Sequence, residues 1–260
     1  MAQMQVSGRA GGEAGDHGGL VHGPDHTIID VSATACQGRI MTLNAHVAPP
    51  ASGGIARQLV ILLHGVGADG ADLFGLVPYV APMLPDAVFI SPDAPFAYDM
   101  APFGRQWFSL QDRSGPALAA GVRATAPLLD AFIDAKLAEY GLDDSDLAVI
   151  GFSQGTMMAL HVAPRRAKTC AGIVGFSGAV VAGETLADEV LSRPRVLLVH
   201  GDADPVVNPA SLATAERTLA AVGIPVLTEL RPDLDHSIDG PGLALATAFL
   251  RQAFGLPLQQ

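Results

Sequence analysis

The sequence predicts an α/β fold with a mostly parallel central sheet and helices on both faces. Six short apolar runs are rich in Val, Ile and Leu and lack polar alternation, as is typical of strands that are covered on both faces. Stretches with helical spacing of apolar residues lie between several of these runs, as in repeated strand-helix-strand units. The runs cover residues 59–63, 87–91, 147–151, 172–177, 195–200 and 226–230.

The remaining elements follow from composition and periodicity. Residues 1–27 are rich in Gly and poor in large apolar residues, so we expect a flexible Gly/His-rich tail before an α/β domain over 28–260. Residues 27–47 are predicted to form an antiparallel hairpin or strand pair at the edge of the sheet. Residues 49–54 are predicted to form a connecting loop. Helical spacing of apolar residues is found over 117–137, after Gly155, over 209–222 and over 242–254.

Composition excludes several classes of function. The chain has 15 Lys and Arg against 26 Asp and Glu, a net charge of −11, so we expect no binding to nucleic acid or to anionic membrane surfaces. No apolar run approaches the roughly 18–20 residues that span a bilayer, and the first residues are neither basic nor strongly apolar. We therefore expect a cytoplasmic protein without stable membrane insertion.

The cysteines and the early histidines predict neither a disulfide framework nor a metal site. Cys36 and Cys170 are too few and too far apart, and are interpreted as buried thiols. The histidines of the tail, His17, His22 and His26, have irregular spacing without a preformed geometry. We expect no metal and no cofactor.

Two serines follow an apolar run, each at the end of the same tripeptide, Gly-Phe-Ser. Ser153 lies in Gly-Phe-Ser-Gln-Gly, whose glycines permit a sharp strand-to-helix turn that exposes the serine oxygen. Ser177 has a glycine two residues before it but Ala179 two residues after it, so it is interpreted as a strand-end residue. Ser153 is the predicted nucleophile.

A serine nucleophile needs a base, and the base needs an acid to hold it in one tautomer. His236 is the histidine that follows both candidate acids, Asp202 and Asp204, between which spacing does not decide. Glu184 is less suitable because it begins a helical stretch, and His64 and His200 are interpreted as structural. Because Asp233, Asp235 and Asp239 surround His236 in sequence, we expect them to influence the acid limb of activity.

The oxyanion of the reaction needs two backbone N–H donors. Gln154 follows the nucleophile and supplies the first, and Val66, in the Gly-rich stretch 62–70, supplies the second. A phosphate-binding interpretation of the same glycines lacks the Gly-Lys-Ser/Thr ending.

At this point the sequence resembles the phospholipase/carboxylesterase family of α/β hydrolases, which includes acyl-protein thioesterases. The matching pieces are LLHGVGADGADL, PDAPF, GRQWFSL, GFSQGTMMAL, LLVHGDADPVV and DHSID. The resemblance implies an α/β-hydrolase fold, a triad of Ser153, Asp204 and His236, and oxyanion donors at Val66 and Gln154. The resemblance also favours Asp204 over Asp202 as the acid of the triad.

The expected function is that of a serine carboxylesterase acting on small to medium carboxylic esters, with a small-molecule ester as its partner. The alternatives are acyl-protein thioesterase or lysophospholipase activity, a lyase or haloperoxidase that shares the triad, and a catalytically weak binding protein. Phe103 and Trp107, in an aromatic stretch, either bind substrate or belong to the core, and Arg105 either recognises a charged group or forms a salt bridge. The residues leave the oligomeric state open, with a homodimer as one candidate.

Overall fold

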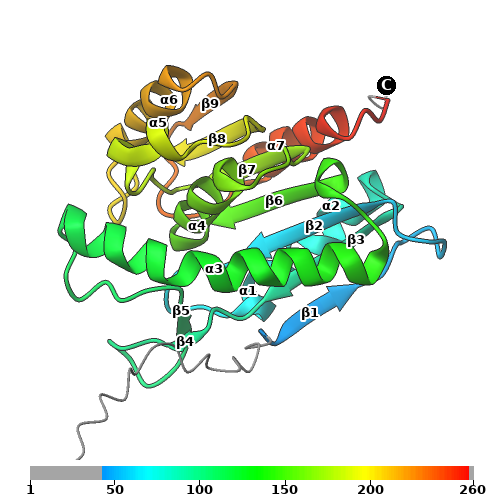
Figure 1. Cartoon of the computed structure of the whole chain (residues 1–260), viewed down its shortest axis with the longest axis horizontal. Coiled ribbons are helices and arrows are strands. Elements are labelled where there is room, and N and C mark those ends of the chain that lie inside the picture. The colour runs from blue at the N-terminus through cyan, green and yellow to red at the C-terminus, as the bar shows by residue number, and fades with distance from the viewer. Residues whose placement is uncertain (1–42, 258–260) are drawn as a thin grey trace, which may run out of the picture. The chain divides into compact units, whose positions relative to one another are not determined.

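The apolar runs of the sequence form the strands of one sheet in the computed structural model, which describes residues 43–257. Within these residues seven strands pair in the order β1-β3-β2-β6-β7-β8-β9 (Figure 1). Within this seven-stranded sheet of the described residues, β1 at one edge runs antiparallel to its neighbour β3, and the other neighbouring strands are parallel. The strands are β1 Ala45–Ala48, β2 Gln58–Leu63, β3 Ala87–Pro92, β6 Leu147–Phe152, β7 Gly172–Phe176, β8 Arg195–Gly201 and β9 Val226–Arg231. A short hairpin, β4 Phe96–Ala97 with β5 Arg105–Gln106, lies outside the sheet.

Helices cover both faces of the sheet, because side chains along a strand point alternately to either side. In β2, Leu59 and Ile61 pack in a cluster with α3, α4 and α6, whereas Val60 and Leu62 pack with α1, α2 and α7. The helices are α1 Gly70–Phe74, α2 Val77–Val80, α3 Gly115–Tyr140, α4 Gln154–Val162, α5 Leu186–Glu189, α6 Ala210–Ala221 and α7 Gly240–Ala253. Five of the six predicted runs are therefore strands buried on both faces, as predicted, whereas the run 226–230 forms the half-exposed edge strand β9.

Each strand and helix expected after residue 58 is present, with shifts only at the ends. The expected edge strand is represented by β1, and residues 49–54 form a turn. The predicted tail over 1–27, Cys36 and the earlier part of the expected hairpin lie outside the described residues. Cys170 is a buried free thiol, and burial raises its pKa to about 12.

A cluster of charges around one buried guanidinium lies at the end of the sheet where β6 begins. The guanidinium of Arg166, which follows α4, is 7% exposed and contacts Asp130 and Asp134 of α3 and Asp144 before β6. Burial alone would lower the pKa of Arg166, but the hydrogen bonds with Asp144 and Asp134 raise it further above its usual range. The cluster ties α3 and the segment after α4 to the start of β6, the strand that ends directly before Ser153.

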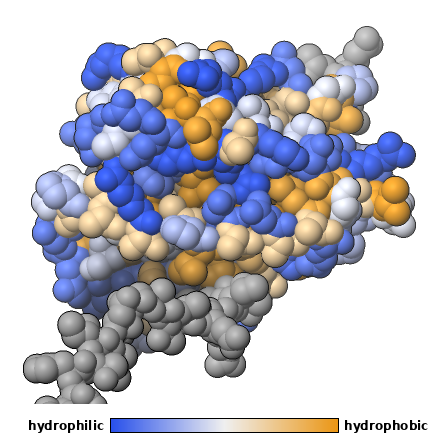
Figure 2. Space-filling model, viewed as in Figure 1, coloured by the Kyte–Doolittle hydropathy of each residue, from blue (hydrophilic) through white to orange (hydrophobic). Residues whose placement is uncertain are grey.

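The surface of the face that carries α3, α4 and α6 is hydrophilic over most of its area, with apolar side chains in separate patches (Figure 2). Among the described helices, none combines the length and apolar character needed to cross a membrane.

Candidate active site

Ser153 occupies a strained turn between β6 and α4. Its backbone has φ 53° and ψ −115°, a conformation that costs a non-glycine residue about 1–3 kcal/mol and that the surrounding structure must hold in place. The turn is held by the N–H of Ser153, which donates to the carbonyl oxygen of Phe176 in the neighbouring strand at 2.9 Å. The strain lifts the serine out of the strand and places it at the N-terminus of α4.

Gly155 allows α4 to start directly against the neighbouring strand. A Cβ at this position would lie 1.8 Å from the carbonyl oxygen of Leu63, a backbone atom that cannot move without disturbing β2. The second glycine of the Gly-x-Ser-x-Gly pattern is therefore required by the contact between helix and strand.

Gly155→Ala is expected to destabilise the protein by about 3 kcal/mol or more, because the added methyl group overpacks a backbone contact. Urea unfolding monitored by circular dichroism measures the loss. The matched control is Gly115→Ala, at the start of α3, where an added Cβ meets nothing within 4 Å. Equal midpoints for the two variants would contradict the role of this contact.

Ser177 is the structural counterpart of Ser153 in the next strand. The two Gly-Phe-Ser tripeptides lie side by side at the ends of β6 and β7, with Gly151 opposite Gly175 and Phe152 opposite Phe176. Ser177 also has positive φ, 47°, and its N–H donates to the carbonyl oxygen of Val199 at 2.9 Å. No helix begins directly after Ser177, and its Oγ is buried without a hydrogen-bond partner among the described residues. It is a strand-end residue, as expected.

Asp204 and His236 meet at the carboxyl ends of β8 and β9. The Nδ1 atom of His236 lies 2.7 Å from Oδ2 of Asp204. Oδ1 of Asp204 accepts the backbone N–H groups of Val206 and Val207 at 2.8 and 2.9 Å. Burial alone would raise the pKa of Asp204, but the hydrogen bonds from His236 and from these two amides lower it below its ordinary value. The carboxylate is therefore ionised at neutral pH and accepts Nδ1–H.

The other aspartates of this region point elsewhere. Asp202 is exposed, and its Oδ1 accepts the backbone N–H of Asp233 at 2.7 Å. Asp235 is exposed and accepts the hydroxyl of Ser237 at 2.5 Å, while Asp239 caps α7. The structure thus brings Asp204, and not Asp202, to the histidine, and it gives Asp235 a hydrogen-bond partner other than the imidazole despite its position in sequence.

The imidazole of His236 lies beside the turn of Ser153. Its ring stands over the ring of Phe152, with 4.8 Å between the centroids and 45° between the planes. Gly65 approaches the same turn from β2, since a Cβ on it would lie 3.3 Å from Cβ of Ser153. Residues from the ends of four strands, β2, β6, β8 and β9, therefore gather at one site.

The loop that contains Val66 is held by a buried neutral histidine. His64 donates from Nδ1 to the carbonyl oxygen of Gly65 at 2.7 Å, and its Nε2 accepts the N–H of Ala94 at 2.9 Å. Burial lowers the pKa of His64, so the ring stays neutral and can make both bonds. This geometry agrees with the structural role expected for His64.

The side chain of Gln154 links the nucleophile turn to the segment after β5. Its Oε1 accepts the N–H of Trp107 at 2.8 Å, and its Nε2 donates to the carbonyl oxygen of Phe108 at 2.7 Å. As the first residue of α4, Gln154 has a backbone N–H without an acceptor inside the helix. The side chain thus fixes the position of the amide that was predicted as an oxyanion donor.

Comparison with known proteins identifies the family. Residues 44–254 match the model of the Phospholipase/Carboxylesterase family. The chain belongs to the phospholipase/carboxylesterase family. It is 30% identical to Esterase YpfH of Escherichia coli over 196 residues, which are 75% of this chain and 83% of that one. It is 40% identical to esterase PE8, whose crystal structure matches 82% of this chain and 99% of that chain with a TM-score of 0.79.

The match to this family confirms the predicted α/β-hydrolase fold and makes the chain a hydrolase. Acyl-protein thioesterase 1 of Gibberella zeae is also similar, at 26% identity over 210 residues, 74% of this chain and 89% of that one. The resemblance stated from the sequence motifs is therefore confirmed.

One residue of this phospholipase/carboxylesterase site was missed by sequence reasoning. His200, buried at the end of β8, has Nε2 at 3.0 Å from the carbonyl oxygen of Val207 and 3.2 Å from Oδ2 of Asp204. Both neighbours are acceptors, so Nε2 carries the proton. His200 therefore places a second imidazole N–H beside Oδ2 of Asp204, and a His-Gly pair at a strand end gives no signal of this contact.

The two aromatic residues expected at the substrate site differ in their exposure. Trp107 is 0% exposed, and its indole N–H donates to the carbonyl oxygen of His64 at 3.0 Å. The structure corrects the expectation that it touches substrate: its side chain supports the Val66 loop from within the core. Phe103 is 73% exposed on the loop between β4 and β5. Arg105 donates from Nε to the carbonyl oxygen of Ala94 at 3.0 Å.

An apolar pocket of about 860 Å³ lies beside α4 in this hydrolase. It is bounded by the first turns of α3, by the loop after Ser177 and by Met157, whose N–H donates to the carbonyl oxygen of Ser153 at 3.2 Å. Its walls are mostly small apolar side chains, including Ala119, Ala179 and Val180. The pocket can hold an aliphatic chain within one helical turn of the serine.

Proposed function

We propose that the chain is a serine carboxylesterase that hydrolyses small to medium carboxylic esters through an acyl-enzyme on Ser153. The observation that carries the proposal is the bond between His236 and an ionised Asp204, beside the strained turn of Ser153. A donated Nδ1–H fixes the ring tautomer that leaves Nε2 as an acceptor. That acceptor is what a serine hydroxyl needs in order to become a nucleophile.

In the proposed reaction, Oγ of Ser153 attacks the carbonyl carbon of the ester while Nε2 of His236 takes the hydroxyl proton. The tetrahedral intermediate collapses, the bond to the leaving alcohol breaks, and the alcohol oxygen takes that proton. Water then attacks the acyl-enzyme, with His236 again accepting and returning one proton, and the carboxylic acid leaves. A thioester would follow the same steps, with a thiol as the leaving group.

The negative charge on the intermediate oxygen would be stabilised by the N–H groups of Val66 and Gln154. The proximity of Gly65 to Ser153 brings the Val66 loop to the reacting carbonyl group. Both donors are fixed before substrate binds, through His64 on one side and the Gln154 side chain on the other. Fixed donors need no reorganisation as charge develops, which is the basis of their catalytic effect.

A fluorophosphonate labelling experiment tests the proposal. We expect one equivalent of label per chain, located on Ser153 by peptide mass analysis, together with loss of activity on p-nitrophenyl butyrate. Label on Ser177, or full activity after complete labelling of Ser153, would show that the nucleophile lies elsewhere.

His200 is expected to act as a positioning residue for Asp204. His200→Leu removes the Nε2–H and should lower kcat by about tenfold with little change in KM, since a lost hydrogen bond to a charged group has roughly this effect. His200→Gln keeps an N–H donor and should recover most of kcat.

Rates on p-nitrophenyl butyrate and melting curves for both variants measure this effect. A merely structural role would lower the melting temperature of His200→Leu without lowering kcat of the folded protein. Equal kcat values for the wild type and His200→Leu would therefore rule out the positioning role.

A further inference from the structure

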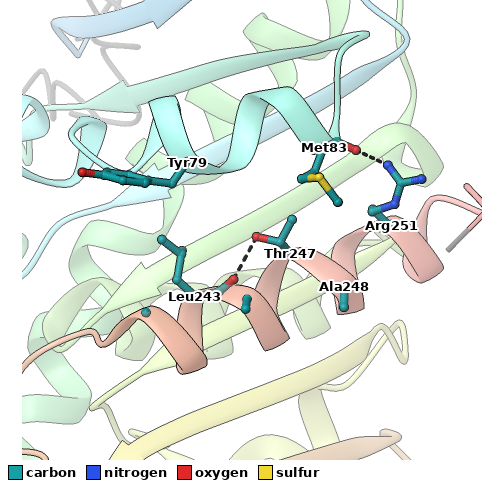
Figure 3. Close-up of a pocket in the computed structure, with 8 residues that line it drawn as sticks. Tyr79, Met83, Leu243, Thr247, Ala248 and Arg251 are labelled. Atoms are coloured by element: carbon teal, nitrogen blue, oxygen red, sulfur yellow. Dashed lines mark hydrogen bonds between the residues drawn. The ribbon is translucent and has the colours of Figure 1, made fainter. Parts of the chain in front are cut away.

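A second pocket, of about 410 Å³, lies away from Ser153, between α7 and the segment formed by α2 and the short helix Ala81–Met83. Figure 3 shows Tyr79 and Met83 on one side of it and Leu243, Thr247, Ala248 and Arg251 of α7 on the other. We call it the α7 groove. It is lined mainly by apolar side chains and does not share residues with the proposed triad.

Small side chains keep the α7 groove open. Gly240, Ala244 and Ala248 line it at every fourth position of α7, so they stand in one row along the helix. Ala244 and Ala248 are exposed, and Tyr79, at 71% exposure, stands at the opposite wall. From Gly240 to Arg251 the row extends about 16 Å at the rise of an α-helix. This length accommodates a medium-length aliphatic chain.

A buried cation closes one end of the α7 groove. Arg251 is 6% exposed, and its two Nη atoms donate to the carbonyl oxygens of Met83 and Pro257. Among residues 43–257 its Nε has no hydrogen-bond partner, and none of the ion pairs between these residues includes it. Asp86 borders the adjoining cavity without forming an ion pair with it. Within the described part of the chain the guanidinium thus has only carbonyl partners, and no bonded carboxylate compensates its formal charge.

We propose that the α7 groove binds an aliphatic carboxylate, with the carboxylate at Arg251 and the chain along the row from Ala248 to Gly240. The apolar walls favour the chain, and the uncompensated charge favours an anionic head over an alcohol or a neutral lipid. This site is separate from the proposed catalysis. Its ligand belongs to the same chemical class as the acid that ester hydrolysis releases.

Titration of the full chain with decanoate labelled with ¹³C at the carboxyl carbon tests the proposal by NMR. The Ser153→Ala background is used, so that the result does not depend on catalytic activity. Because an acid can also enter the pocket beside α4, the groove is identified by variants: Ala248→Trp fills it and should abolish one saturable binding event. Leu245→Trp is the matched control, since Leu245 is 41% exposed on the same helix and does not line the groove.

The contribution of the Arg251 charge to binding is tested separately. Decanol should bind the groove at least about tenfold more weakly than decanoate, and Arg251→Gln should weaken decanoate binding to a similar extent. If Arg251→Gln fails to fold, the comparison of decanoate with decanol still decides. The proposal is overturned if no binding event responds to Ala248→Trp, or if decanol binds as tightly as decanoate. It is also overturned if decanoate binds only to a chain that lacks residues 258–260, which follow Pro257, a partner of Arg251.

Discussion

Ser153→Ala is expected to lower kcat/KM for ester hydrolysis by about 10⁶-fold and to leave the fold intact. The substitution removes the only atom that forms the proposed acyl-enzyme, while the donors on Val66 and Gln154 keep a residual rate above that in water. Stability should change little, because alanine and serine meet the same steric cost at φ 53°. Initial rates on p-nitrophenyl butyrate and a melting curve measure the two effects.

Ser177→Ala is the matched control, because it makes the same change in the neighbouring strand at a similar backbone conformation. It should retain the activity of the wild type. Its melting temperature should be equal or higher, since the variant removes a buried hydroxyl that has no partner among the described residues. A large loss of activity in Ser177→Ala, with Ser153→Ala still active, would reverse the assignment of the nucleophile.

The sheet was predictable because its strands are buried on both faces. In β2 and β3 every residue is buried, and most of each strand is an apolar run with a clear start and end. The same reasoning is weaker at the edges, where β1 and β9 are half exposed and mix polar with apolar residues. The run 226–230 was still found, because three of its five residues are Val or Leu.

The turn at Ser153 was predictable because its chemistry and its packing need glycine at fixed positions. Gly155 is required by a contact with the backbone of β2, so the presence of glycine at this position directly reflects how α4 packs against the sheet. The sequence does not show that Ser177 adopts nearly the same φ in the next strand. What separates the two serines is the helix that begins after the first and not after the second.

The contacts of individual polar side chains were not predictable from spacing. Asp202 and Asp204 are two residues apart after the same strand, and only the completed fold buries one and exposes the other. Asp235 is adjacent to His236 in sequence but bonds to Ser237. Trp107 contacts the carbonyl group of His64, which follows another strand, so no local pattern marks this contact. His200 contacts Asp204 and Val207 in the loop after its own strand, and spacing alone does not show that this loop turns back to the imidazole.

Asp204→Asn is expected to lower kcat by about 10⁴-fold, by changing the tautomer of His236 rather than its position. Oδ1 of Asp204 accepts the N–H groups of Val206 and Val207, so the amide oxygen of asparagine must take that place. The amide nitrogen then faces Nδ1 of His236 and donates to it. A neutral ring that accepts at Nδ1 carries its proton on Nε2, where it cannot take the proton of Ser153.

Asp202→Asn is the control, and it should stay within about tenfold of the wild type. Asp202 is exposed, and an asparagine oxygen can still accept the N–H of Asp233. Rates for both variants should be measured across the pH range. The pKa of Asp204 is already held below its ordinary value, so protonation of this carboxylate does not limit the rate of the wild type near neutral pH. Asp204→Asn should therefore lower the plateau itself, and raising the pH should not restore it. Comparable losses in the two variants, or recovery of Asp204→Asn at high pH, would show that the carboxylate does not act through the tautomer of His236.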